Sequence, residues 1–308
     1  MTHPSPTHPA SSALLAARSL CATQLLPQAC LLMVATPIGN LADISLRALA
    51  MLERCDLVAA EDTRMAQRLL QAYDLSKPLL RADRHREQQA AAALLEALGR
   101  GQKVAFVSDA GTPAINDPGA LLTRAARDAG YPVIPLPGDS SVSTALSAAG
   151  IELALGYSFV GYAPASAKQR QEFWREQLLS PRTVVCFEAP HRIADSLAEL
   201  AALAPQRPLL LAKELTKQFE TLRRGTPQQL LDWLAADPRH AQGEFLLALE
   251  PSVVAADVDA QAQSWLLRLA RELPASRAAA LVAEMLGADR KTLYRWLLQQ
   301  QGGQAAAE

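Results

Sequence analysis

The amino-acid sequence predicts an α/β protein with two domains and a small helical module at its C-terminal end. Short apolar runs alternate with segments of helical periodicity through the first half of the chain, and a second alternating block follows. Beyond Pro251 the strand-like segments disappear. A chain of 308 residues, half of them apolar, has the length of about two domains and can bury a large core.

The overall charge excludes a protein that attracts nucleic acid through a global positive field. Lysine and arginine total 30, and aspartate and glutamate total 31, so any contact with RNA must come from a local basic patch. The four cysteines lack the spacing of a zinc site and the density of a disulfide scaffold, which favours a reducing cytoplasm. The five histidines form no ligand cluster, so we expect no metal. No run approaches the ~20 apolar residues of a membrane-spanning helix.

Residues 1–29 are expected to form a disordered N-terminal tail. They are rich in Ala, Ser, Pro and Thr, and Arg18 and Gln24 interrupt their one apolar stretch. The segment lacks the basic start of a signal peptide, and strand-like sequence follows it at once, which disfavours a secretory signal.

Residues 30–150 form the predicted N-terminal α/β domain. The apolar run CLLMVA at residues 30–35 ends at Thr36-Pro37, which is typical of a buried strand that enters a loop. Further strands are expected at 57–60, 104–107 and 133–136, and helices at 44–54, 85–98, 140–149 and after Pro118. Alternation of this kind predicts a parallel sheet with helices on both faces.

A pause in the alternation at residues 150–156 marks the expected boundary, and residues 151–252 form the predicted second α/β domain. Its strands are expected at 158–162, 183–187, 208–213 and 244–250, and its helices at about 168–179 and 190–203. Thr226 as N-cap, Pro227 at the first helical position and Gln229 as partner in a capping box predict one more helix, ending near Ala236.

Residues 259–300 are predicted to form a helix-turn-helix-like module of three short helices. The turn is Gly287-Ala288-Asp289, and the residues expected on the packing side are Leu281, Met285, Leu293, Trp296 and Leu297. The last helix carries Arg290, Lys291 and Arg295 at spacings that can reach RNA phosphates. The alternative is a capping bundle whose basic face only meets solvent.

Four loops rich in Gly and Pro follow predicted strands, and ligands bind at that carboxyl edge in open α/β sheets. They are TPIGN at 36–40, SDAGTPAINDPG at 108–119, PLPGDSS at 135–141 and FEAPHR at 187–192. One such loop alone can do no more than turn the chain. Neither a Walker A pattern nor GxGxxG occurs. Together the loops indicate a ligand held by backbone amides and carbonyls, which suits an adenosyl group with an amino-acid tail.

The order of several motifs resembles a known family. The run VATPIGNLADISLRAL, followed by VAAEDTR, VSDAGTPAINDPG, PLPG, FEAPHR and KELTK, resembles the bacterial ribosomal RNA small subunit methyltransferase I family from about residue 31 to 299. The resemblance implies a tetrapyrrole-methylase-like fold, with a parallel sheet in the N-terminal domain and a mixed sheet in the second. It also implies S-adenosylmethionine folded in a cleft at the domain interface. It further implies a homodimer that methylates the 2'-hydroxyl of a cytidine in the decoding region of 16S ribosomal RNA.

The resemblance assigns roles to residues at matching positions. The cofactor-binding candidates are Pro37, Gly39, Asp109, Gly111, Pro113, Pro137 and Gly138, with Phe187, Gly243 and Glu244 from the second domain. A ribose hydroxyl is weakly acidic, so a base or acceptor should lie within reach of its oxygen. The catalytic candidates are Glu61, Asp62, Glu188 and His191. The RNA-binding candidates are Arg64, Arg192 and Lys217, together with Arg290, Lys291 and Arg295.

Some of these residues have structural alternatives. His191 can cap the helix after Pro190, and the Glu61, Asp62 and Arg64 group can be an ion pair at a strand end. The chain also departs from the family pattern. The family usually has a His-x-His-Asn-Glu-like stretch at the position of Asp83-Arg84-His85-Arg86-Glu87, and PLPGP where this chain has Asp139.

Two other functions are compatible with this fold. One is methylation of a tetrapyrrole such as a precorrin or uroporphyrinogen, and the basic C-terminal module disfavours it because a small-molecule enzyme has no evident use for one. The other is a non-catalytic ribosome-binding factor, which the intact set of glycine loops disfavours.

Overall fold

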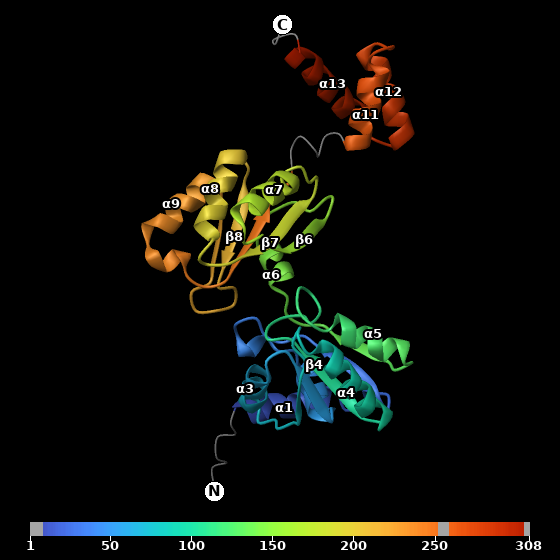
Figure 1. Ribbon diagram of the computed structural model, residues 1–308, viewed down its shortest axis with the longest axis vertical. Coiled ribbons are helices and arrows are strands. Elements are labelled where there is room, and N and C mark those ends of the chain that lie inside the picture. Colours follow the sequence, from blue (N-terminus) through green and yellow to red (C-terminus); the bar gives the residue numbers. More distant parts are fainter. Residues whose placement is uncertain (1–8, 252–258, 305–308) are drawn as a thin grey trace. The chain divides into compact units, whose positions relative to one another are not determined.

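The structure is a computed structural model that describes residues 9–251 and 259–304 (Figure 1). The chain divides into two compact units, which are described separately. The first unit comprises the residues up to Thr144 together with Glu214–Glu220, and the second comprises Ala145–Lys213 and the residues from Thr221 on. The first unit thus ends before the boundary expected near residue 150, and it includes a later loop. In the described part of the chain, no helix is both long and apolar enough to cross a membrane.

The first unit contains the predicted parallel sheet. Its five strands have the order β3-β2-β4-β1-β5, and every pair is parallel. The strands are β1 (Cys30–Val34), β2 (Leu57–Ala60), β3 (Leu79–Arg81), β4 (Lys103–Val107) and β5 (Val133–Leu136). β3 was not predicted, because three residues at a sheet edge are too short to give an apolar run.

Helices cover both faces of this sheet. They are α2 (Leu46–Arg54), α3 (Thr63–Ala72), α4 (Glu87–Gly99) and α5 (Ala120–Asp128). The 3-10 helix η1 (Leu41–Asp43) follows β1, and the boundary between the two units falls within helix α6 (Ser141–Ser147). Leu32 of β1 lies in the core that α2 and α3 cover, whereas Leu31 lies with Phe106 in the core under α4 and α5, which run side by side in Figure 1. Because both faces of β1 are buried, its sequence is continuously apolar.

The expectation of a disordered tail over residues 1–29 is wrong for the part that the structure describes. Helix α1 (Pro9–Leu20) packs on α2, with Leu14 7% exposed and Ala17 fully buried, and Arg18 pairs with Glu53. The residues that face the core are spaced as one helical stripe. Most of them are small, so a composition of Ala, Ser, Pro and Thr concealed the stripe.

The second unit contains the mixed sheet that the resemblance implied. Its order is β6-β7-β10-β8-β9, with β6 and β7 parallel and the other pairs antiparallel. The strands are β6 (Tyr157–Tyr162), β7 (Thr183–Glu188), β8 (Leu209–Lys213), β9 (Thr221–Gly225) and β10 (Phe245–Leu249). β9 was not predicted, because this edge strand exposes Arg223 and Arg224 and so lacks a buried strand's apolar run.

The helices of this unit are α7 (Ala167–Gln177), α8 (Ile193–Leu203) and α9 (Pro227–Ala236), followed by the 3-10 helix η2 (Pro238–Ala241). The predicted start of α9 is confirmed. The hydroxyl of Thr226 accepts from the Gln229 N–H at 3.3 Å, and the Gln229 side chain accepts from the Thr226 N–H at 2.9 Å. This reciprocal capping box fixes where the helix begins.

Three helices form the C-terminal module, namely α11 (Ala260–Leu269), α12 (Ala275–Leu286) and α13 (Arg290–Gln304). Gly287 ends α12 in the left-handed conformation, and the Asp289 carboxylate accepts from the Thr292 N–H at 2.8 Å. Leu293, Trp296 and Leu297 are buried as predicted. The expectation for Met285 is wrong, since it is 55% exposed; Leu281 is only half-buried, and Val282 carries the packing instead.

The start of α5 depends on a glycine. Gly119 has φ 125°, and a Cβ there would lie 2.6 Å from Cε1 of the buried Phe106 ring. We expect Gly119→Ala to lower the free energy of unfolding by about 2–4 kcal/mol, from backbone strain and overpacking together. Gly130→Ala is the control, because Gly130 also has a positive φ but has open space around it, and about 1 kcal/mol is expected there. Urea denaturation measures both, and equal losses would contradict the packing argument.

Candidate active site

Three of the predicted loops meet at the carboxyl edge of the first sheet. They follow β1, β4 and β5, which are neighbours in the order β4-β1-β5, and parallel strands end at one edge. Thr36 and Gly111 exchange two backbone hydrogen bonds of 2.9 Å, and the Thr112 hydroxyl donates to the Asp139 carbonyl at 2.8 Å. The loops are thereby fastened to one another as well as to the sheet.

The loop after β1 lies close to the backbone of the segment 214–220, which belongs to the same unit. A Cβ on Gly39 would lie 2.5 Å from Cγ of Lys217 and 2.9 Å from the Leu215 carbonyl oxygen. Only glycine fits at this distance. The Lys217 ammonium bonds the Glu214 carboxylate at 2.9 Å. Lys217, an RNA-binding candidate, therefore lies against a candidate cofactor loop.

Of the five left-handed residues other than glycine in the described part of the chain, four lie in two loops of this unit and the fifth is Asp74. Ala114 and Asn116 have φ values of 65° and 66°, and Glu214 and Thr216 have values of 50° and 63°. Each such residue stores strain of about 1–3 kcal/mol, and such strain is concentrated at functional sites. The two strained loops are the one after β4 and the one that covers Gly39.

Two buried polar atoms of this unit lack a hydrogen-bond partner within the described residues. They are Oδ2 of Asp139 and the hydroxyl oxygen of Thr216. An unpaired buried polar atom costs about 1–3 kcal/mol. Burial, reinforced by the nearby Asp43 carboxylate, raises the pKa of Asp139. A polar ligand that pairs with these atoms would remove the cost, so the site suits a ligand with its own donors.

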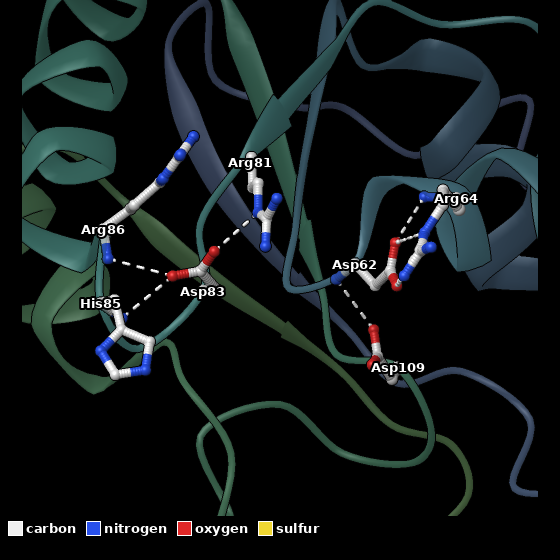
Figure 2. Close-up of polar contacts among 7 residues, drawn as sticks. All are labelled: Asp62, Arg64, Arg81, Asp83, His85, Arg86 and Asp109. Carbon is white, nitrogen blue, oxygen red and sulfur yellow. Dashed lines mark hydrogen bonds and ion pairs between the residues drawn. The ribbon is translucent and has the colours of Figure 1, made fainter.

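Asp62, at the end of β2, has a structural role. Its carboxylate caps α3 by accepting from the Arg64 N–H at 2.8 Å, and it also accepts from the Arg64 guanidinium at 2.6 Å (Figure 2). Its own N–H donates to Oδ1 of Asp109 at 2.9 Å. The hydrogen bonds from the Arg64 side chain and backbone lower the pKa of Asp62 to about 2. The ion pair considered from the sequence is therefore present, and it makes Asp62 a weak base.

Glu61 has the opposite electrostatic environment. Burial raises the pKa of its carboxyl, and the nearby Asp109 and Asp117 carboxylates raise it further, while Arg84 opposes them. A base that works near neutral pH needs a pKa shifted in this direction. In residues 9–251 and 259–304, no three His, Cys, Asp or Glu side chains are grouped as metal ligands. The raised pKa of Glu61 favours a role in proton transfer.

Glu188 of the second unit anchors a helix. It is 1% exposed, and it accepts from the Ala189 N–H at 2.7 Å, the Arg192 Nε at 2.9 Å and the Ser196 hydroxyl at 2.5 Å. Both carboxylate oxygens are therefore occupied, which favours a structural role over the predicted catalytic one. Arg192, an RNA-binding candidate, forms an ion pair with Glu188. His191 is exposed and is not the N-cap of α8, which is Arg192.

The remaining candidates of the second unit lie near one end of two neighbouring strands, β7 and β10. Phe187, the penultimate residue of β7, packs against Phe159 and Tyr162, and its ring centroid lies 5.0 and 5.3 Å from theirs. Gly243 and Glu244 precede β10, and β10 pairs antiparallel with β7 so that Phe245 lies opposite Glu188. The antiparallel register places Phe187 opposite Leu246, and Gly243 and Glu244 lie just beyond the end of β10 that pairs with Glu188.

Two charged residues of the first unit were not among the candidate site residues, Arg81 not at all and Asp83 only as part of the stretch 83–87. Arg81 is the last residue of β3, and Asp83 follows two residues later. Arg81 pairs in register with Ala60 of β2, which directly precedes Glu61. No sequence signal placed them beside Glu61, because β3 is too short to give an apolar run. Of the RNA-binding candidates in the C-terminal module, Arg290 and Lys291 are exposed at the start of α13, whereas the Arg295 side chain lies outside the described part.

Two family models match the chain. The model described as Tetrapyrrole (Corrin/Porphyrin) Methylases matches residues 31–231, and the model described as RsmI C-terminal HTH domain matches residues 256–301. Together they cover nearly all of the predicted N-terminal domain, most of the second domain and the helical module.

Curated relatives and solved structures agree with these matches. The chain is 44% identical over 274 residues to a ribosomal RNA small subunit methyltransferase I of Escherichia coli O157:H7, covering 88% of this chain and 96% of that protein. It is 43% identical over 266 residues to the protein of the same name from Neisseria meningitidis serogroup B, covering 86% and 91%.

Among solved structures, the methyltransferase CobJ has a TM-score of 0.55 at 17% identity over 73% of this chain and 95% of that one. A uroporphyrin-III-C-methyltransferase from Thermus thermophilus has a TM-score of 0.51 at 22% identity, over 73% and 96%. At these identities the structures show the shared fold alone. The predicted two-sheet methylase fold is confirmed, and the identities to the curated relatives place this chain in the ribosomal RNA small subunit methyltransferase I family.

Proposed function

We propose that this protein transfers a methyl group from S-adenosylmethionine to the 2'-hydroxyl of a cytidine in the decoding region of 16S ribosomal RNA. One observation carries the proposal: a single chain combines the methylase match at 31–231 with the helix-turn-helix match at 256–301. The curated relatives named as ribosomal RNA methyltransferases match over 86–88% of the chain. The cytoplasm is the compartment that fits a ribosomal substrate, and a homodimer remains a prediction.

The cofactor would be held in the first unit by the loops after β1, β4 and β5. The candidate residues remain Pro37, Gly39, Asp109, Gly111, Pro113, Pro137 and Gly138, with Phe187, Gly243 and Glu244 proposed from the second unit. The unpaired oxygens of Asp139 and Thr216 support this proposal, since S-adenosylmethionine carries ammonium, amino, hydroxyl and carboxylate groups. When bound, S-adenosylmethionine supplies the methyl group from its positively charged sulfonium. Loss of this methyl group leaves a neutral thioether.

Glu61 is the best-supported acceptor for the proton of the ribose hydroxyl. As the bond between the 2'-oxygen and the methyl carbon forms and the sulfur–carbon bond breaks, the hydroxyl proton passes to the Glu61 carboxylate. Asp62 is disfavoured because Arg64 lowers its pKa to about 2, and Glu188 because both its oxygens are occupied. His191 remains a candidate on the second unit, where it is exposed. Alignment of the reacting atoms supplies the rest of the acceleration.

The C-terminal module would bind RNA. Arg290 and Lys291 are exposed in the first turn of α13, after a turn that the Asp289 carboxylate caps. Basic side chains on such a helix contact phosphates and position the substrate. The Arg64 guanidinium, also exposed, is held by Asp62 and would add a contact beside the reacting centre.

Methyl transfer to 30S subunits tests the proposed function. With tritiated S-adenosylmethionine and 30S subunits from a strain lacking this gene, we expect label on one ribose of a decoding-region cytidine. Precorrin and uroporphyrinogen acceptors should remain unlabelled. Label on a tetrapyrrole would identify the alternative enzyme. Cofactor binding by calorimetry without transfer to any acceptor would support a non-catalytic factor.

Replacement of Glu61 tests the proton acceptor. Glu61→Gln should lower kcat by about 10²–10⁴-fold, the usual contribution of a general base, with unchanged cofactor affinity. The base must be ionised, so wild-type activity should fall as pH drops through the pKa of Glu61, which burial places above the ordinary ~4.3. The pH profile of kcat for Asp62→Asn is the comparison and should keep this acidic limb. A Glu61→Gln variant that retains the limb would remove Glu61 from the role.

Replacement of Glu188 separates anchoring from catalysis. Glu188→Gln leaves Arg192 without its carboxylate partner, so the free energy of unfolding should fall by about 3 kcal/mol, as when a buried pair is broken. Glu172→Gln, on the exposed face of α7, is the matched control. Urea denaturation followed by tryptophan fluorescence measures both. Unchanged stability combined with a hundredfold lower kcat would return Glu188 to the catalytic residues.

A further inference from the structure

The turn after β3 is held rigid by one carboxylate. Oδ1 of Asp83 accepts from the N–H groups of His85 and Arg86 at 3.0 and 3.1 Å, and Oδ2 accepts from Nε of Arg81 at 2.6 Å (Figure 2). Both oxygens are thus used inside the turn, which fixes its backbone before any ligand arrives. Little conformational entropy remains to be lost on binding.

The turn lies beside the proposed proton acceptor. Ala60 and Arg81 are paired in register, and the Ala82 N–H donates to the Ala60 carbonyl at 2.8 Å. Adjacent strands are about 4.8 Å apart, so the chain leaving β3 runs next to Glu61 and Asp62. Any strand of RNA that places a ribose at Glu61 therefore passes over or close to this turn.

The turn presents two cations that form no ion pair within the described residues, although the Arg84 charge acts on the nearby Glu61 and Asp117 carboxylates. In the described residues, Asp62 is paired with Arg64 and Asp83 with Arg81, whereas Arg84 and Arg86 form no ion pair. Arg84 bonds the Asn116 carbonyl, which leaves most of its donors available. The Arg86 side chain is exposed and points away from Asp83 (Figure 2).

The next acidic residue in the chain does not cancel these charges. Oε1 of Glu87 accepts from the N–H groups of Gly119 and Leu121 at 2.9 and 3.2 Å, so this carboxylate is directed to the start of α5. Arg84 and Arg86 are left as two exposed guanidinium groups on a fixed turn. Guanidinium groups bind phosphate through paired, charge-assisted hydrogen bonds.

We infer that the turn Asp83–Arg86 is a phosphate-binding surface, on which Arg84 and Arg86 contact the RNA backbone next to the target nucleotide. The inference rests on the proposed function and adds a second RNA contact, distinct from the C-terminal module. Here Asp83 fixes the turn and Arg86 supplies the additional cation.

The salt dependence of RNA binding tests this surface. The dissociation constant of 30S subunits is measured from 50 to 200 mM KCl for the wild type, Arg86→Gln, Arg84→Gln and the control Arg100→Gln. Arg100 is exposed at the opposite end of the same helix, α4. Removal of one arginine–phosphate pair should reduce the slope of log affinity against log salt by about 0.7–0.9. Each turn variant should also bind about 5- to 10-fold more weakly, which corresponds to about 1–1.4 kcal/mol, while Arg100→Gln matches the wild type.

The outcomes separate this inference from the proposed function. Cofactor affinity and the urea midpoint of Arg86→Gln should equal those of the wild type, because its side chain is exposed and forms no ion pair. If the wild type methylates 30S subunits but Arg86→Gln keeps its affinity and salt slope, the surface is refuted and the function stands. Weaker binding with an unchanged slope also refutes a phosphate contact. A wild type that transfers no methyl group to 30S subunits refutes the function itself.

Discussion

Parallel pairing of β4, β1 and β5 is the constraint on which the site depends. It brings three chain segments, separated by about 30 to 70 residues, to one edge of the sheet, and the Thr36–Gly111 bridge then fixes their loops in register. Close backbone approach follows, and Gly39 and Gly138 have no room for a side chain. The site is therefore built mainly from backbone groups, which suits recognition of a ligand with many small polar groups and little net charge.

The elements predicted correctly were those buried on both faces or marked by local chemistry. β1 is continuously apolar because cores lie on both of its sides, and α9 begins where its capping box places it. Helix α3 was also missed although its sequence is amphipathic and Asp62 caps it, whereas three other missed elements gave weaker signals. β3 is three residues long, β9 carries arginines on a sheet edge, and α1 uses alanines to pack. Their formation depends on tertiary partners that no local pattern contains.

The candidate carboxylates show the same limit at the site. Glu61 and Asp62 are neighbours in the sequence, yet their pKa values shift in opposite directions, because Arg64 bonds Asp62 while Glu61 is buried near Asp109 and Asp117. Glu188 looked equivalent in sequence, but Ser196 and Arg192, from the next helix, occupy its oxygens. Residue type identified the set of candidates. Only the contacts of each side chain distinguish Glu61, the proposed proton acceptor, from Asp62, which caps a helix, and Glu188, which anchors one.

The charge balance explains why the arginines beside the site are distributed as they are. With a net charge of -1, the protein has no long-range field to collect RNA, so its affinity must come from a few short-range contacts. A surface rich in carboxylates around Glu61 would repel phosphate. Arg64 and Arg81 offset two of those carboxylates by pairing with them, and the rigid turn after β3 leaves Arg84 and Arg86 available. The ion pairs at Asp62 and Asp83 reduce the repulsion of an anionic substrate, while the Asp109 and Asp117 carboxylates still raise the pKa of Glu61.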